Sequence, residues 1–191
     1  MSTYYNLLDT QRGDFVLNAT TLAAIQGPQT RYLSLTDAKA DSGIPLTAAA
    51  GTPAGAVGIS RTAGTSLQLV GEATSSSAKT DKAFFEFNLP STYVAGAAIP
   101  VVVNAIVTGS GTLTGASTTI TVAAYTETNG VEAALTVSAA QQFDKTGETL
   151  TFTVTGTGLA PGQHVAVEIT MLVTSASGAN TGVINSVAIQ A

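Results

Sequence analysis

Hydrophobic and polar residues alternate along much of the chain, and this period of two predicts strands with one buried face. In residues 83–89, Ala83, Phe85, Phe87 and Leu89 fall on one side and Phe84, Glu86 and Asn88 on the other. Residues 101–107 are apolar on both faces, which is typical of a central strand covered on both sides. Pro90 and Gly96 punctuate the link, so we predict that the two strands form a hairpin at the centre of the core.

Later segments repeat the strand pattern. Residues 149–155 place Leu150, Phe152 and Val154 on one face, and residues 164–174 and 183–190 predict two further strands. Asn129-Gly130 favours a type I′ hairpin turn. With these two residues as the loop, the register places these residues opposite each other: Thr121 and Ser138, Val122 and Val137, Ala124 and Leu135, Tyr125 and Ala134, Glu127 and Glu132.

About eight strands at short spacing, without a long helix between them, predict an all-β fold. We expect one antiparallel β-sandwich or jelly roll over residues 66–191, preceded by an N-terminal arm or small subdomain in residues 1–65. The predicted core is formed by strand residues that point inward: Phe85, Phe87, Val101, Val103, Val122, Leu135, Leu150, Phe152, Val154, Val167 and Ile169.

The first third of the chain has a different character. Residues 1–30 carry large apolar side chains without a sustained period, and residues 46–64 are rich in alanine and glycine, as in a linker or a loosely attached strand pair. Residues 1–30 are either a strand and turn packed on their own domain, or an extended arm that contacts a neighbouring subunit, or a disordered tail. In the arm hypothesis the partner contacts are Tyr4, Tyr5, Leu7, Leu8 and Phe15.

The amino-acid composition disfavours several classes of function. Only 10% of the residues are charged, which suits a protein that is assembled with others, and the net charge of −5 disfavours a nucleic-acid partner. The absence of cysteine excludes thiolate catalysis and zinc–sulfur sites. No signal peptide and no membrane-spanning run is visible, so we expect synthesis in a cytoplasm.

Candidate chemistry is sparse. His164 is the only histidine, no serine lies in a nucleophile elbow, and Asp37 and Asp41 lack the spacing of a calcium loop. We therefore expect no enzyme activity, no cofactor and no metal site. Glu127 and Glu132 are the exception, because like charges directly opposed across a hairpin are mildly destabilising. Either a cation or basic partner bridges them, or both carboxylates extend into water.

Two stretches resemble a known family: FEFNLPSTYVAGAAIPVVVNA (85–105) and GLAPGQHVAVEI (158–169), followed by a final strand. The pattern is similar to the jelly-roll decoration, or cement, proteins of tailed-bacteriophage heads, over roughly residues 66–191. The resemblance implies a viral structural protein on the exterior of the virion. It also implies a homotrimer that braces neighbouring subunits of the major capsid protein.

A second function remains open. A β-sandwich of this kind also serves as a phage head-fibre, receptor-binding or glycan-binding module. Glycan sites present aromatic rings beside polar groups, whereas this chain has no tryptophan and its tyrosines are scattered in sequence, which favours the structural interpretation. A bacterial surface or pilus-like subunit is disfavoured by the missing signal peptide.

Overall fold

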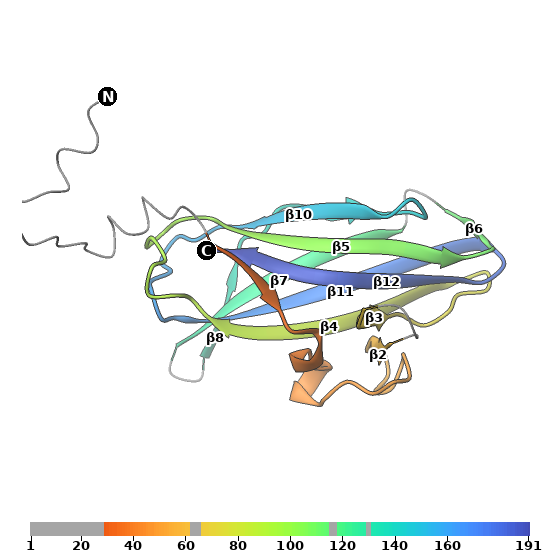
Figure 1. The fold of residues 1–191 in the computed structure, drawn as a ribbon, viewed down its shortest axis with the longest axis horizontal. Helices are drawn as coiled ribbons and strands as arrows, with labels where there is room; N and C mark the ends of the chain where they lie inside the picture. Colours follow the sequence, from red (N-terminus) through yellow and green to blue (C-terminus); the bar gives the residue numbers. More distant parts are fainter. Residues whose placement is uncertain (1–28, 62–65, 115–117, 129–130) are drawn as a thin grey trace, which may run out of the picture.

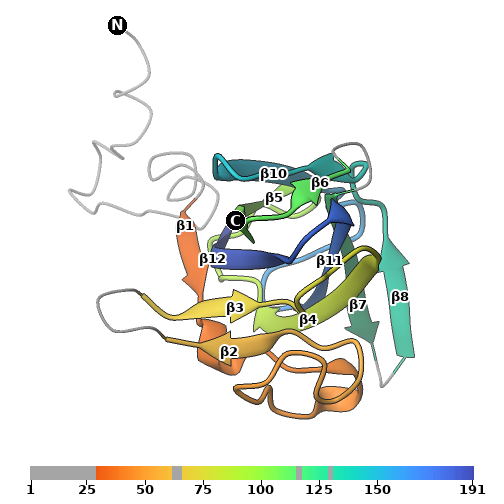
Figure 2. The same ribbon diagram turned by 90° about the vertical axis from the view of Figure 1, so that its right-hand side faces the viewer.

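Two antiparallel β-sheets packed face to face make up the body of the protein (Figures 1 and 2). The computed structural model describes residues 29–61, 66–114, 118–128 and 131–191. The predicted all-β, antiparallel sandwich of jelly-roll type is confirmed. Its only helices among the described residues are two short 3₁₀ turns, Leu35–Asp37 and Asp41–Gly43, and neither is long and apolar enough to cross a membrane.

Sheet A has the strand order β10-β5-β12-β3-β2, and β1 pairs with the last residues of β12. Its strands are β1 (Thr30–Leu33), β2 (Gly58–Ser60), β3 (Gln68–Val70), β5 (Ile99–Gly109), β10 (Glu148–Val154) and β12 (Asn180–Gln190). Sheet B has the order β4-β11-β7-β8, with β6 on β11 and β9 on β7. Its strands are β4 (Ala78–Asn88), β6 (Thr112–Leu113), β7 (Thr119–Thr128), β8 (Val131–Leu135), β9 (Gln141–Gln142) and β11 (His164–Ser177).

The core lies between the sheets and is built from the inward residues of each strand. Every other residue of β11, from Val165 to Val173, is buried, as the alternation predicts. Ten of the eleven predicted core residues are buried, and the exception, Leu135, is half-buried because β8 is the edge strand of sheet B. The hydrophobic side chains of the two sheets therefore meet in one continuous core.

The predicted central hairpin is wrong. β4 pairs with β11 in sheet B, whereas β5 pairs with β10 and β12 in sheet A, so the link between them crosses from one sheet to the other. The physical reason is length: residues 89–98 are too many for a tight turn and span the end of the sandwich. β5 is central, but only its inner face is buried, and Val102, Asn104 and Ile106 on the other face are half-exposed.

The two stretches that carry the family resemblance meet at this end of the sandwich. The Leu89 N–H donates to the Gln163 carbonyl at 2.9 Å, and the Gly162 N–H donates to the Leu89 carbonyl at 2.9 Å. The Gly96 N–H donates to the Leu159 carbonyl at 3.0 Å. The side chain of Tyr93 is buried and its hydroxyl donates to the backbone of the same link. These residues close one end of the sandwich. The sequence pattern on which the resemblance depends is therefore explained by the fold.

The hairpin of β7 and β8 has the predicted register near its tip. Ala124 faces Leu135, Tyr125 faces Ala134, and Glu127 faces Glu132. The turn residues 129–130 lie outside the described residues.

Beyond Leu135 the predicted pairing of this hairpin fails, because β8 ends and the chain crosses to sheet A. There Val137 bridges to Val154, and the Ser138 N–H donates to the Thr153 carbonyl at 3.1 Å. Val137 and Ser138 thus lie along the edge of β10. The expected pairs of Val137 with Val122 and of Ser138 with Thr121 are therefore absent.

The sandwich begins earlier than the predicted boundary at residue 66. β1 pairs with β12 and β2 pairs with β3, so residues 30–33 and 58–60 belong to sheet A. Short strands are predictable at residues 31–35 and 56–60, but nothing in the local pattern shows that they belong to the sheet of the sandwich. Residues 1–28 lie outside the described residues, and with them Tyr4, Tyr5, Leu7, Leu8 and Phe15, so the arm hypothesis stays a prediction.

One carboxyl group is buried in the core. Asp81 is 2% exposed; one of its oxygens accepts a hydrogen bond from the Glu72 N–H at 2.8 Å, and the other has no partner among the described residues. Burial raises the pKa of Asp81 above the ordinary carboxyl value, and the hydrogen bond only partly offsets this. The group therefore holds its proton to a higher pH in the folded chain than in the unfolded chain.

This difference makes Asp81 a source of pH dependence. Because the folded pKa is raised, its contribution to stability is complete below the unfolded pKa and is lost as pH rises through the folded pKa. We expect Asp81→Asn, an uncharged side chain of the same shape, to raise the free energy of unfolding at pH 7 and to change it little in acid. Urea unfolding from pH 3 to pH 8 measures this; equal effects of the substitution at both ends would contradict the assignment.

Candidate binding site

A groove of about 460 Å³ lies on the outer face of sheet B. Its floor is formed by side chains of β4, β11 and β7, one wall by residues 39–43 and the other by β8. It is large enough for a small ligand, since such sites usually measure ~300–1,000 Å³. The residues that line it are Lys39, Ala40, Asp41, Gly43, Phe84, Glu86, Tyr125, Glu132, Ala166 and Glu168.

Tyr125 on β7 and Phe84 on β4 are the half-buried aromatic residues that line the groove. Tyr125 points outward because β7 alternates, with Val122 and Ala124 turned to the core. Its direct cross-strand neighbours are alanines, Ala166 on β11 and Ala134 on β8. A methyl group is too short to cover a neighbouring ring at the usual cross-strand spacing of ~4.5–5.5 Å. The small neighbours therefore leave the groove beside the tyrosine.

Residues 39–43 form the groove wall because Lys39 is tied to β4. The Lys39 N–H donates to the Phe84 carbonyl and the Phe84 N–H to the Lys39 carbonyl, both at 2.9 Å. The Lys39 ammonium also lies 2.7 Å from Glu86 Oε2. Both side chains of this ion pair are more than a third exposed, so it adds little stability. The backbone pair holds the wall in place.

Two lysines neutralise two of the groove's carboxylates. Lys39 lowers the pKa of Glu86 through their hydrogen bond, and Glu86 is therefore ionised throughout the neutral range. On the floor, the Lys82 ammonium lies 2.8 Å from Glu168 Oε1, and the Thr170 hydroxyl donates to the same oxygen at 2.9 Å. The hydrogen bond to Glu168 raises the pKa of Lys82. These two carboxylates have fixed positions.

Of the predicted pair of glutamates, Glu132 lines the groove, and Glu127 lies opposite it on β7. Glu127 and Glu132 face each other across β7 and β8, and Glu127 shares the outer face with Tyr125, two residues before it. His164 Nδ1 lies 3.9 Å from Glu127 Oε2, which is an ion pair only when the imidazole is protonated. Glu132 has neither an ion pair nor a side-chain hydrogen bond within the described part of the chain.

No three acidic or histidine side chains among the described residues converge closely enough to hold a metal ion. The carboxylates instead surround the groove as separate acceptors. His164 begins β11, as predicted. Asp144 lies on the loop before β10 and Glu148 is the first residue of that strand, and neither lines the groove. The described residues therefore offer acceptors and an aromatic ring.

Sequence reasoning did not reveal that Phe84 and Tyr125 line the same groove. The two residues are distant in sequence, but β11 lies between their strands and both line the groove. The signal was present: Phe84 is an aromatic residue on the face of its strand that also carries Glu86 and Asn88. A single aromatic residue at a solvent-facing position is ordinary, and it indicates a binding surface only where other such residues join it.

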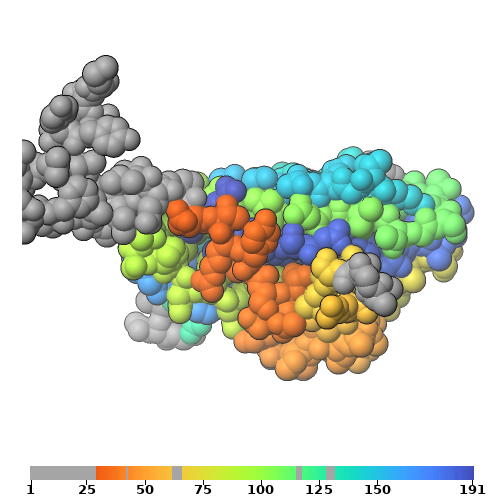
Figure 3. All heavy atoms as spheres, viewed as in Figure 1, coloured from red at the N-terminus to blue at the C-terminus, as the bar shows by residue number. Residues whose placement is uncertain are grey.

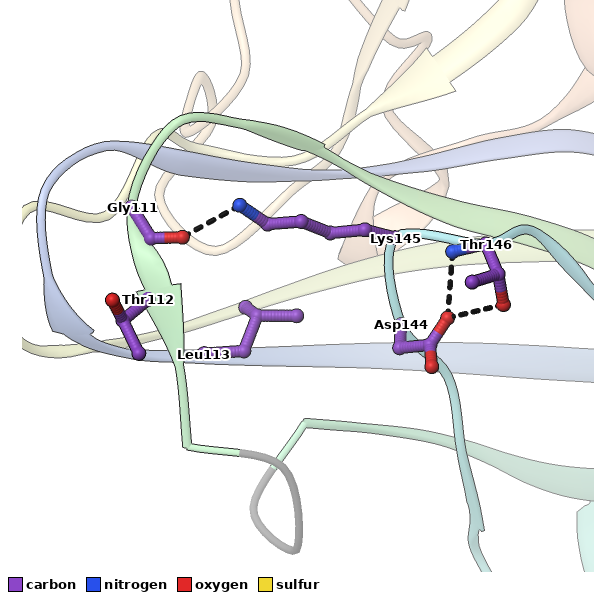
Figure 4. A pocket seen from close by; sticks show the side chains of 6 residues that line it. All are labelled: Gly111, Thr112, Leu113, Asp144, Lys145 and Thr146. Atoms are coloured by element: carbon purple, nitrogen blue, oxygen red, sulfur yellow. Dashed lines mark hydrogen bonds between the residues drawn. The ribbon is translucent and has the colours of Figure 1, made fainter.

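A second hollow, of about 290 Å³, lies at the opposite end of the sandwich (Figure 4). Its charged side chains form hydrogen bonds within the protein. The Lys145 ammonium donates to the carbonyls of Gly109 and Gly111 at 2.8 Å and 2.6 Å, while Asp144 accepts from the Thr146 N–H and hydroxyl, both at 2.6 Å. The Lys145 ammonium and the Asp144 carboxylate already have partners within the protein. The contacts of Lys145 hold two loops together and leave neither charged group for a ligand.

The outer face of sheet A, seen in Figure 3, differs sharply from that of sheet B. The outward positions of β5, β10 and β12 carry no charged residue. Polar side chains form a chain across the three strands: the Thr149 hydroxyl donates to Asn104 Oδ1 at 2.6 Å, and Asn104 Nδ2 donates to Ser186 Oγ at 2.7 Å. Tyr32, 69% exposed, pairs with Ala188 at the edge of this face.

Comparison with known proteins gave no family model and no curated protein that matches the chain. Solved structures that are similar to part of the chain include three carbohydrate-binding modules. They are the CBM22-1 xylan-binding domain of Paenibacillus barcinonensis Xyn10C (12% identity, 70% of this chain, 79% of that one, TM-score 0.38), TmCBM61 in complex with β-1,4-galactotriose (11%, 70%, 81%, 0.37), and Family 16 Carbohydrate Binding Module-2 (11%, 70%, 84%, 0.37).

Proposed function

We propose that the protein is a binding module for saccharides and that its site is the groove on the outer face of sheet B. The observation that carries the proposal is Tyr125, whose ring stands between two alanines on the floor of a groove surrounded by carboxylates. Catalysis forms no part of the proposal.

The chemistry of the groove matches that of a sugar ring. A pyranose has an apolar face of C–H groups and a rim of hydroxyl groups. The Tyr125 ring supplies an apolar surface with a polar tip for the first. Glu86 and Glu168, fixed by their lysines, supply acceptors for the second, and hydrogen bonds to a charged acceptor are the stronger kind.

A panel of oligosaccharides tests the proposal by isothermal titration calorimetry. The panel contains neutral hexose, acetylated and deacetylated amino-sugar, and uronic-acid oligomers of equal length. We expect at least one class to bind, and we expect Ala166→Leu, which fills the groove floor, to abolish that binding. The matched control is Thr151→Leu on the outer face of sheet A. Absence of binding to every class, or binding unaffected by Ala166→Leu, would overturn the proposal.

A second candidate function is the one that the family resemblance implies, a trimeric decoration protein on the exterior of a phage capsid. The observation that favours it is the uncharged outer face of sheet A. A protein with a net charge of −5 meets the least repulsion from its own copies where its surface has no charge. A heterologous contact through this face that closes into a ring of copies leaves no unpaired interface.

Light scattering on the full chain at micromolar concentration tests this second candidate. We expect three times the monomer mass of 19.1 kDa. Replacing Val102 on this face with glutamate introduces like charges into the interface and is expected to return the monomer. A wild-type protein of monomer mass would contradict self-association in solution.

A further inference from the structure

We infer that the groove selects a cationic amino sugar, with the sugar ring on Tyr125 and its ammonium between Glu127 and Glu132. This inference rests on the proposed function and names the class of saccharide. It starts from the charges on the outer face of sheet B. Around Tyr125 the charged lining residues are one lysine and four acids: Lys39, Asp41, Glu86, Glu132 and Glu168.

On the β8 side, the groove is lined by the carboxylate of Glu132. Glu86 and Glu168 are each within 2.8 Å of a lysine ammonium, so their charges are compensated. Glu132 has no ion pair among the described residues, and Glu127 has only His164, whose Nδ1 lies 3.9 Å from its Oε2. Directly opposed like charges destabilise a strand pair, and a cation between them removes that cost. An anionic sugar on this side would add a further repulsion.

The spacing fits one sugar unit. Glu127 follows Tyr125 by two residues on the same face of β7, which separates them by ~6.6–6.8 Å along the strand. Glu132 approaches the same point from β8, on the far side of the ring from Glu168. A pyranose that stacks on the ring therefore directs an amino group on its rim toward the two carboxylates. An acetylated nitrogen has lost both the charge and the small size that this position requires.

The groove's other features agree with a positively charged ligand. The phenol ring itself attracts a cation through its negative face. Glu127 and Glu132 are both exposed, so their carboxylates are accessible without any movement of the backbone. The uncharged outer face of sheet A offers no comparable acceptor for an ammonium group.

The test compares three oligomers of equal length by calorimetry on the full chain: a deacetylated glucosamine oligomer, its N-acetylated form and a neutral glucan. We expect the deacetylated oligomer to bind at least tenfold more tightly than the other two, and its advantage to shrink as salt rises. We expect Glu132→Gln to reduce the affinity for the deacetylated oligomer to that for the neutral glucan.

The matched control is Glu148→Gln, which removes the same charge from the opposite sheet. It is expected to keep the preference, and loss of preference in both variants would show attraction to net charge alone and overturn the inference. A neutral glucan that binds as tightly as the amino sugar, with binding lost in Ala166→Leu, would overturn the inference and leave the proposed function standing. Failure of all three oligomers to bind would overturn the inference. If no other oligosaccharide of the panel binds either, the proposed function is overturned as well.

Discussion

Phe152→Ala is expected to lower the free energy of unfolding by about 3–5 kcal/mol, the range for removing a fully buried phenylalanine. Phe152 has no exposed surface and lies opposite Val101 on the inner face of sheet A. Its strand, β10, is at the edge of that sheet and has only threonines on its outer face. The inward side chains of Leu150, Phe152 and Val154 therefore supply most of what holds the strand to the core.

Urea unfolding followed by circular dichroism measures this loss. Thr151→Ala, the neighbouring exposed position on the same strand, is the matched control and is expected to change the free energy by less than about 0.5 kcal/mol. A Phe152→Ala protein as stable as the parent would show that β10 does not depend on the core between the sheets.

Tyr125→Ala is expected to weaken saccharide binding by about 10- to 100-fold, with the fold retained. Loss of a buried contact of that size corresponds to ~1.4–2.7 kcal/mol of binding free energy. The ring is half-buried in the free protein, and its neighbours on both sides are alanines, so its removal leaves no cavity in the core.

Calorimetry on the purified variants measures the effect. Tyr32→Ala is the matched control, because Tyr32 is an exposed tyrosine at the outer face of sheet A, and its loss is expected to leave affinity unchanged. An equal loss of affinity in both variants would place the binding surface elsewhere.

Strand positions were predictable because alternation of hydrophobic and polar residues is a local signal. Leu150, Phe152 and Val154 on β10 and the five inward residues of β11 show it clearly. The register of β7 with β8 was also predictable, since a two-residue turn fixes which residues face each other. Such signals determine which face of a strand is buried.

The assignment of strands to sheets was not predictable from the same signals. β4 and β5 are consecutive, and nothing in their alternation shows that one belongs to each sheet. The deciding contacts join residues far apart in sequence, such as Leu89 with Gly162 and Gln163. The bridge of Val137 to Val154 is of the same kind, because Val154 lies on an edge strand of the other sheet.

The candidate site was only partly predictable. The Glu127–Glu132 pair followed from the turn, whereas the groove depends on Lys39 bonding to Phe84 and on β11 carrying Ala166 beside Tyr125. The tyrosines are scattered in sequence, and the second aromatic residue that lines the groove with Tyr125 is Phe84, two strands away. Distance in sequence says little about proximity on a sheet whose strands follow a crossed order.

The most direct test of the central claim is a map of backbone amide shifts by nuclear magnetic resonance during titration with the oligosaccharide panel. The account predicts that the largest changes fall on residues 39–43, 84–86, 123–127, 132–134 and 164–168, which surround the groove on sheet B. Amides of β5, β10 and the outer face of sheet A are expected to remain unchanged. Changes confined to sheet A, or no change with any saccharide, would contradict it.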